Sequence, residues 1–244
     1  MNTTKASPQG TNRKTAITVG VLYILGTVAG VLSVIVLGGL LDAPDYLNVV
    51  ASSASRVQLI ALLMLVMGLA LAIVPAMMFP VLRRRNEALA MGYVIFRGAL
   101  ETFTTLALAI CWLLLAVAAR QYADSGAAVA SVYAGLGTLL LKAQDPIMTV
   151  GTIVFGLGAL MLYYLLFQTG LIPRWISGWG IVAAVATLVA GLSAVFGTNL
   201  DILELVMLPQ EMVMAVWLIA KGFDPAALAA LPAKTATNER LSAS

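Results

Sequence analysis

The sequence has no histidine, a single cysteine and few charged residues, and each shortage excludes a class of function. Without histidine, imidazole-based metal sites and histidine-dependent catalytic triads are excluded. The single thiol, Cys111, can form neither an intrachain disulfide nor a thiolate cluster. We therefore expect no metal and no cofactor, and we assign no catalytic residue.

Apolar residues are abundant instead. They make up 61% of the 244 residues, against roughly 45–50% in a soluble domain, and the mean hydropathy is +0.98. A helix of about 20 apolar residues crosses a hydrocarbon core of about 30 Å. Segments long enough to do so lie near 15–41, 57–82, 88–119, 146–173, 175–200 and 202–221. We predict an all-α, polytopic transmembrane helix bundle of six spans over residues 15–222.

Lysine and arginine are unevenly distributed among the predicted loops, and positively charged loops stay in the cytoplasm. If the N-terminus is cytoplasmic, most basic residues fall on that side, including the run 83–85. The other side receives Arg56, Arg120 and Lys142 together with several aspartates. We predict cytoplasmic termini, with a segment 1–14 before the bundle and a flexible tail 223–244 after it. Because "LRRR" is a short loop between spans, no nucleic acid is expected as a partner.

The stretch 125–142 is apolar but short for a span, with 17 residues between charged or turn-forming positions. Making it a seventh span would move Arg174 and the basic C-terminal segment to the exterior. We therefore predict a helix near 125–141 at the outer surface, and a seventh span stays open. Asp145 before Pro146 is typical of the start of the next helix.

Small residues recur at helical spacing within the spans. Gly26 and Gly30 lie four apart on one face of the first span, and Gly151, Gly156 and Gly158 mark the fourth. This pattern predicts close helix contacts. It does not predict a phosphate-binding loop, because no strand precedes these glycines.

The third span contains two opposite charges in the stretch "YVIFRGALETF". Arg97 and Glu101 are four residues apart, so they share a helix face and can pair; Tyr93 extends that face. With residue 88 at the cytoplasmic boundary, a rise of 1.5 Å per residue places Arg97 about 13 Å and Glu101 about 20 Å deep. Both positions lie within the hydrocarbon layer.

The sixth span supplies acidic groups at a similar depth. Counting from Lys221, Glu211 lies about 16 Å deep, between the levels of Arg97 and Glu101. On an α-helix Glu204 and Glu211 share one face, and Pro209 between them is expected to kink the helix. We predict that the third and sixth spans face each other.

One arginine between two carboxylates leaves an excess negative charge in a medium where an isolated ion costs several kcal/mol. A proton, a cation or a donor group of a ligand would compensate it, and Glu211 is the group that we expect to take up the proton. The alternative is a structural role, in which the charges only hold helices in register.

Three functional classes remain open. The first is binding or transport of a small or lipid-like molecule, with or without a link to protons. Its candidate residues are Arg97, Glu101, Glu211, Glu204 and Tyr93. The second is a structural or accessory membrane subunit that presents a small-residue face to a partner or to another copy of itself. The third is a carboxylate-dependent membrane enzyme, which the lack of an evident nucleophile disfavours. The first class is our prediction, and in every class membrane lipids surround the bundle.

The motifs "FRGALE" and "LPQEMVMAVWLIAKGF" resemble those of a bacterial membrane-protein family filed as a domain of unknown function, number forty-three eighty-six. The resemblance covers roughly 15–223, and its most specific part is the pattern formed by Pro209, Glu211, Trp217, Lys221, Gly222 and Phe223. It implies a six- or seven-helix protein of the bacterial inner membrane. It implies no reaction.

Overall fold

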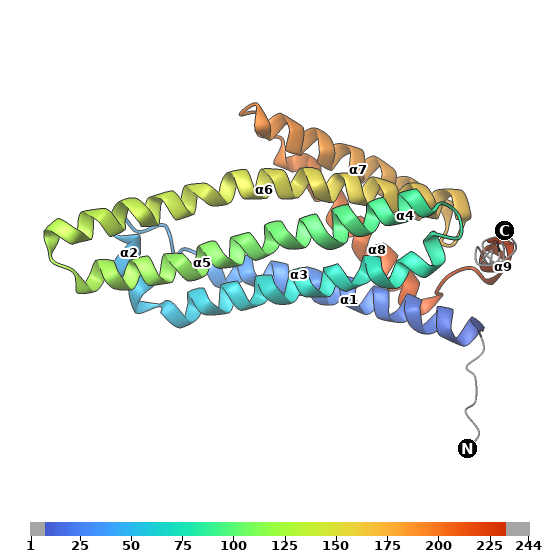
Figure 1. Cartoon of the computed structure of the whole chain (residues 1–244), viewed down its shortest axis with the longest axis horizontal. Coiled ribbons are helices and arrows are strands. Elements are labelled where there is room, and N and C mark those ends of the chain that lie inside the picture. Colours follow the sequence, from blue (N-terminus) through green and yellow to red (C-terminus); the bar gives the residue numbers. More distant parts are fainter. Residues whose placement is uncertain (1–7, 233–244) are drawn as a thin grey trace, which may run out of the picture.

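The computed structural model describes residues 8–232, and all regular elements in this part of the chain are helices (Figure 1). Its elements are α1 (Pro8–Leu37), α2 (Tyr46–Ser52), α3 (Ala54–Leu82), α4 (Glu87–Tyr93), the π-helix η1 (Val94–Leu100), α5 (Glu101–Asp124), α6 (Ala127–Thr169), α7 (Arg174–Val195), the 3₁₀-helix η2 (Asp201–Val206), α8 (Met207–Ala220) and α9 (Pro225–Ala230). Six helical stretches among them are long and apolar enough to cross a membrane. The predicted all-α membrane bundle is confirmed.

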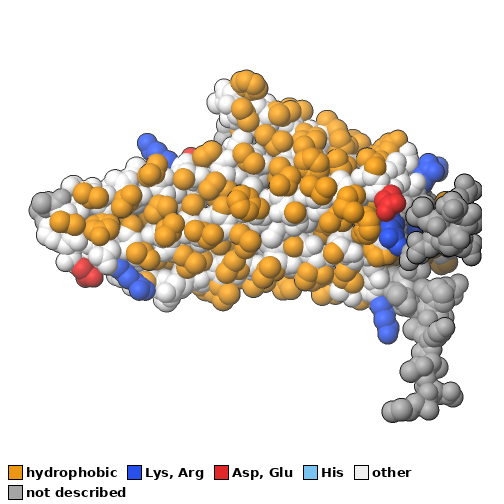
Figure 2. All heavy atoms as spheres, in the orientation of Figure 1, with side chains coloured by type: hydrophobic (Ala, Val, Ile, Leu, Met, Phe, Trp, Pro, Cys, Tyr) orange, Lys and Arg blue, Asp and Glu red, His pale blue; other side chains and the backbone are white. Residues whose placement is uncertain are grey.

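The six spans form a closed ring of neighbours. α1 packs against α3 and α8, α3 also packs against α5, α6 packs against α5 and α7, and α7 returns to α8. Each helix is exposed on its outer side to the surroundings of the ring, where apolar side chains cover most of the visible surface (Figure 2). Polar groups that need partners can find them only inside such a ring.

Glycines bring α1 and α3 together, as their spacing predicts. A Cβ at Gly26 would lie 2.7 Å from Cγ of Leu71, and one at Gly30 would lie 2.7 Å from Sδ of Met67. The two glycines therefore serve contacts inside the bundle. The small-residue face that we considered for an external partner is already occupied by α3.

α6 is one continuous helix of 43 residues. Residues 127–141, expected as a separate surface helix, are its first part, and the helix continues through Pro146 without a break. A proline removes a single N–H donor, and the exposed neighbours here tolerate that loss. At 1.5 Å per residue α6 is about 64 Å long, roughly twice the hydrocarbon thickness. With α5 it forms a long hairpin that extends past the other helices in Figure 1.

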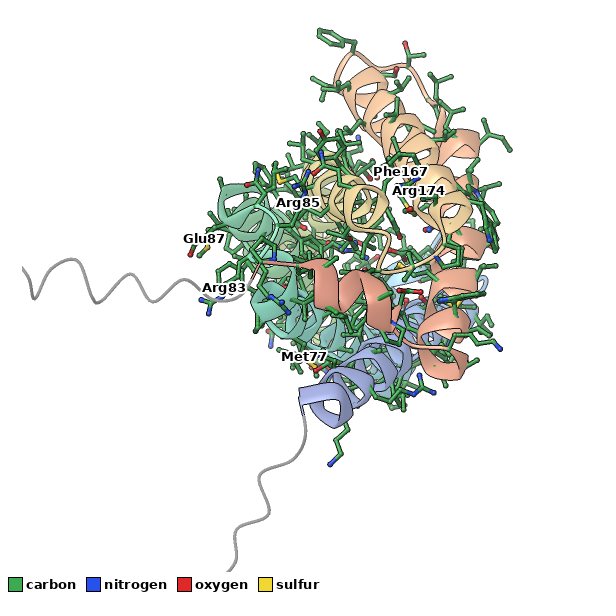
Figure 3. All side chains as sticks on the ribbon, turned by 90° about the vertical axis from the view of Figure 1, so that its right-hand side faces the viewer. Met77, Arg83, Arg85, Glu87, Phe167 and Arg174 are labelled. Atoms are coloured by element: carbon green, nitrogen blue, oxygen red, sulfur yellow. The ribbon has the colours of Figure 1, made fainter. Side chains whose placement is uncertain are left out.

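Charged residues collect at the two ends of the ring (Figure 2). The start of α1 and the short helix α9 lie at the same end, which we call the terminal end (Figure 1). Figure 3 looks onto this end and shows Arg83, Arg85 and Arg174 at its rim. The opposite end, which holds α2 and the tip of the α5–α6 hairpin, is called the far end. Of the predicted flanking segments, 8–14 belong to α1 and 225–230 to α9, whereas 1–7 and 233–244 lie outside the described residues.

Two apolar cores fill the ring. The larger one includes Tyr23, Met78, Tyr93, Leu162 and Met214. The second one, at the far end, packs α2 against α3 and α5 through residues such as Leu47, Val50, Ile60, Trp112 and Leu115.

Candidate functional site

Arg97 is buried within the ring and pairs with two carboxylates. Its Nη1 donates to both carboxylate oxygens of Glu101 at 2.8 Å, and its Nη2 donates to Oε1 of Glu211 at 2.7 Å. The arginine side chain is 2% exposed, and those of Glu101 and Glu211 are 15% and 11% exposed. The ion pair between Arg97 and Glu211 confirms the predicted contact between the third and sixth spans. The prediction rested on depth along each helix, which placed these groups at one level. We call these three residues the Arg97 triad.

The arginine lies at the centre of a π-helical turn. The N–H of Glu101 donates to the carbonyl of Phe96, five residues back, instead of the usual four. The hydroxyl of Thr102 donates to the carbonyl of Gly98 at 2.7 Å. This wider turn keeps α4, η1 and α5 in one continuous helix, with Arg97 at the middle of the turn. Such single turns occur frequently at functional sites.

Thr104 and Thr105 do not contact the triad's carboxylates. Both hydroxyls donate to the backbone carbonyl of Glu101, at 2.8 and 2.9 Å. They therefore stabilise the helix just after the π-turn, whereas the carboxylate of Glu101 accepts from Arg97.

Aromatic rings and one glycine form the walls around the guanidinium. The Cζ atom of Arg97 lies 4.0 Å from the ring centroid of Phe155 on α6 and 5.9 Å from that of Tyr23 on α1. Stacking of this kind stabilises a desolvated cation by up to about 2 kcal/mol. α6 approaches closely because Gly158 has no side chain: a Cβ there would lie 3.0 Å from both Cβ and N of Arg97.

Three buried tyrosines accompany the triad. The hydroxyls of Tyr23 and Tyr93 are 3.4 Å apart, so the predicted residue Tyr93 reaches the site through Tyr23. The hydroxyl of Tyr163 has no hydrogen-bond partner among the described residues. Gln210 faces it, but the amide nitrogen of Gln210 donates to the carbonyl of Ile176 and its Oε1 is left without a partner.

The ion pair with Arg97 uses one of the two carboxylate oxygens of Glu211. Its Oε1 accepts from Arg97, whereas no group of the described residues donates to Oε2. The triad carries one positive and two negative formal charges, so the free oxygen is where a proton or a donor group would bind.

Glu204 lies outside the triad. It is on η2, whose 3₁₀ geometry has about 3.0 residues per turn, so the shared α-helical face with Glu211 does not continue this far. Glu204 lies beside Thr152 of α6 instead. The change from 3₁₀ to α geometry occurs at Met207, and Pro209 follows in the first turn of α8, where its missing N–H needs no partner.

A narrow void separates the tyrosine pair from the terminal end. Tyr23 and Tyr93 line one side of it and Phe223 the other, and it is too narrow to hold a water molecule. Phe223 also lines a wider pocket at the terminal end. Within the described residues, no group of three or more histidine, cysteine or acidic side chains is arranged to hold a metal ion.

Sequence reasoning missed Tyr23, Phe155, Tyr163 and Gln210. For Gln210 there was a signal, since an amide beside Glu211 in an apolar span needs a partner. The tyrosines were weaker signals because their rings fit an apolar span. Phe155 gave none, since only packing places it against the guanidinium.

The chain matches a protein family along most of its length. The family is described as a domain of unknown function (DUF4386), and the match covers residues 18–222. The chain belongs to this family, as the motifs around Arg97 and Glu211 indicated. No curated protein and no solved structure was found to match it.

Proposed function

We propose that the Arg97 triad is a binding site for a small or lipid-like molecule with a cationic or hydrogen-bond-donating group, and that binding is linked to a proton. The observation that carries this proposal is the charge imbalance together with the free Oε2 of Glu211. A net negative charge inside an apolar ring costs several kcal/mol unless something compensates it. A proton on one carboxyl compensates it in the absence of ligand, and the ligand's donor group replaces that proton on binding.

The surrounding geometry supports a ligand of mixed character. The tyrosine and phenylalanine rings near Arg97 suit an apolar or aromatic body. The hydroxyl of Tyr163 and Oε1 of Gln210 are buried polar atoms of two residues that face each other, and neither atom has a hydrogen bond of ordinary geometry among the described residues. A ligand that reaches them would supply the missing hydrogen bonds.

Phe223 lines both the void beside the tyrosine pair and the wide pocket at the terminal end. Phe223, 6% exposed, lies between the wide pocket and the void beside Tyr23 and Tyr93. The void has no room for water, so in this proposal a ligand reaches the triad only after side chains around the void move. Movement of Phe223 would join the pocket to the void and bring solvent to the tyrosine pair.

Infrared difference spectroscopy of the protein in lipid nanodiscs tests the proton. Wild type is expected to show the C=O stretch of a protonated carboxyl at neutral pH, and Glu211→Gln is expected to lose it. Glu204→Gln is the matched control, since this carboxylate lies outside the triad. A fully ionised triad in mildly acidic buffer would overturn the proton link.

Thermal unfolding tests the ligand. Purified protein is heated with a panel of alkylamines and with the neutral alcohols of the same chain length. We expect amines, and not alcohols, to raise the unfolding temperature of wild type, and Glu211→Gln to lose this difference. An equal response to both sets would contradict the proposed role of the carboxylates.

A second candidate is the structural one, in which the triad only holds η1 to α8. The close fit favours it, because the guanidinium has both carboxylates, an aromatic ring at 4.0 Å and no space for water in the adjacent void. In that case Glu211→Gln lowers stability but changes neither proton uptake nor the response to amines. The experiments above therefore separate the two candidates.

For the location, we propose the inner membrane of a bacterium with the terminal end in the cytoplasm. The support is the basic rim of Arg83, Arg85 and Arg174 at that end. Reporter fusions after Pro232 test the orientation: a fluorescent protein is expected to be active there and a periplasmic phosphatase inactive. The reverse result would place the terminal end outside.

A further inference from the structure

The terminal end holds a basic pocket that the Arg97 triad does not use. It has a volume of about 400 Å³. Arg13, Arg84 and Lys221 supply its charged lining, and Phe223, Pro225 and Leu228 supply apolar walls. We call it the basic pocket.

No carboxylate of the described residues forms an ion pair with these cations, and the nearby carboxylate of Asp224 caps α9 instead. Among the described residues, every ion pair involves Arg97, so Arg13, Arg84 and Lys221 have no acidic partner. The basic pocket lies at the membrane–water interface, because its residue Lys221 directly follows Ala220, the last residue of the sixth span. Three uncompensated cations at that level attract an anionic group.

Two of the cations are held in place by helix ends. Arg13 donates to the carbonyls of Leu218, Ile219 and Ala220 at the end of α8, at 2.8–3.2 Å. It fits there because Gly222, two residues past the end of α8, has φ +76° and no side chain; a Cβ there would lie 2.8 Å from Nη1 of Arg13. The guanidinium is thus fixed beside the pocket.

Arg84 is positioned in the same way by α9. It donates to the carbonyls of Leu231 at 2.7 Å and Pro232 at 2.9 Å. Carbonyls at a helix end carry a partial charge of only about half an electron. Two such ends leave most of the charge of Arg13, Arg84 and Lys221 uncompensated, and Lys221 has no partner of its own among the described residues.

An apolar groove begins where the basic pocket ends. It also has a volume of about 400 Å³ and is lined by Trp175, Met212, Val216, Trp217 and Lys221. Lys221 therefore borders both hollows. Trp175 is 59% exposed at this level, as expected for an aromatic residue at the membrane interface.

We propose that the basic pocket and this groove together bind one anionic phospholipid of the adjacent leaflet. Its phosphate lies among Arg13, Arg84 and Lys221, and one acyl chain lies along Val216 and Met212 between the two tryptophans. The charge of the pocket selects an anionic headgroup, and the groove selects a molecule with a hydrocarbon chain. A soluble phosphate would use the first feature only.

Native mass spectrometry of the protein released from nanodiscs of equal parts phosphatidylglycerol and phosphatidylcholine tests this site. Wild type is expected to retain phosphatidylglycerol in excess. Lys221→Gln should reduce that excess about fivefold, from the contribution of one basic side chain near the surface. Lys14→Gln is the matched control, because this exposed lysine is the neighbour of Arg13 but does not line the pocket.

Two further experiments distinguish a phospholipid from the other molecules that could occupy the basic pocket. Ala220 also lines the groove, so Ala220→Trp fills it and should lower retention of phosphatidylglycerol. Added inorganic phosphate should not displace the lipid. Complete displacement by phosphate would show a site for free anions, and equal losses in Lys14→Gln and Lys221→Gln would show a diffuse surface charge. Lipid retention only after removal of 233–244 would assign the pocket to the chain's own tail. Each of these three results overturns the proposal.

Discussion

Nη2 of Arg97 lies 2.7 Å from Oε1 of Glu211, although 114 residues separate the two positions. The contact joins η1 to α8 across a ring in which α8 packs mainly against α1 and α7. A buried ion pair between such distant elements contributes to the choice of one helix arrangement over another, and its removal exposes the cost of the charges that remain.

Removal of the arginine is expected to destabilise the bundle strongly. Arg97→Ala leaves two carboxylates buried without a cation, and breaking a buried pair in this way costs about 3–5 kcal/mol. Unfolding of the purified protein in mixed micelles with increasing dodecyl sulfate measures the free energy of unfolding. Arg83→Ala, which removes a guanidinium 5.5 Å from the ring of Phe79 at the terminal end, should cost about 1 kcal/mol or less. Equal effects of the two substitutions would contradict a special role for the triad.

Neutralising the whole triad is expected to restore much of this loss. In Arg97→Met/Glu101→Gln/Glu211→Gln no buried charge remains, and replacing a complete buried ion pair by neutral groups is often close to neutral in stability. The triple variant should therefore unfold at a higher dodecyl sulfate fraction than Arg97→Ala alone. Unfolding in dodecyl sulfate tests this prediction as well. If the free-energy loss of the triple variant equals the sum of the losses of the three single variants, the three side chains are not energetically coupled.

A methyl group on α6 should disturb the arginine. The Cβ in Gly158→Ala would lie 3.0 Å from the backbone nitrogen of Arg97, so the helices must move apart, at a cost of about 1–3 kcal/mol. Gly98→Ala is the control within the π-turn, because its Cβ would meet Pro75 at an ordinary distance of 3.6 Å. Alanine favours a helix by up to about 1 kcal/mol over glycine, so this control should be neutral or stabilising. Similar losses in both variants would show that the turn itself, and not the approach of α6, limits stability.

Removal of the hydroxyl of Tyr163 and removal of that of Tyr93 should have different effects on the stability of the protein. Tyr163→Phe removes a hydroxyl that has no partner among the described residues, so stability should stay the same or rise. Tyr93→Phe removes one member of the pair with Tyr23 and should cost about 0.5–1.5 kcal/mol. The free energies of unfolding of the two variants give the comparison. A clear loss in Tyr163→Phe would mean that its hydroxyl has a partner in solution.

Truncation of Phe223 should open the route to the triad. In Phe223→Ala the wall between the basic pocket and the void beside Tyr23 is removed, so solvent reaches the tyrosine pair. We expect the infrared carboxyl bands to respond faster after a pH jump than they do in wild type. Phe196→Ala is the matched control, since that ring is 85% exposed after α7. Unchanged rates in Phe223→Ala would exclude this path.

Local patterns along the chain were sufficient for the spans and for the members of the triad. Hydropathy locates a span because each helix must cover about 30 Å of hydrocarbon with its own residues. The pairing of Arg97 with Glu101 follows from helical spacing. The meeting with Glu211 could be predicted because depth from the interface depends only on the number of residues from a span's end.

Tertiary packing decided everything that surrounds this triad. The ring order of the helices, the placing of Phe155 and Tyr23 against the guanidinium, and the π-turn depend on contacts between distant segments. The continuation of α6 through Pro146 and the separation of Glu204 from Glu211 were not predicted either, because an α-helical repeat was assumed where the chain changes geometry or continues. Spacing along one helix determines which residues share a level, whereas only the packing of several helices determines which of them touch.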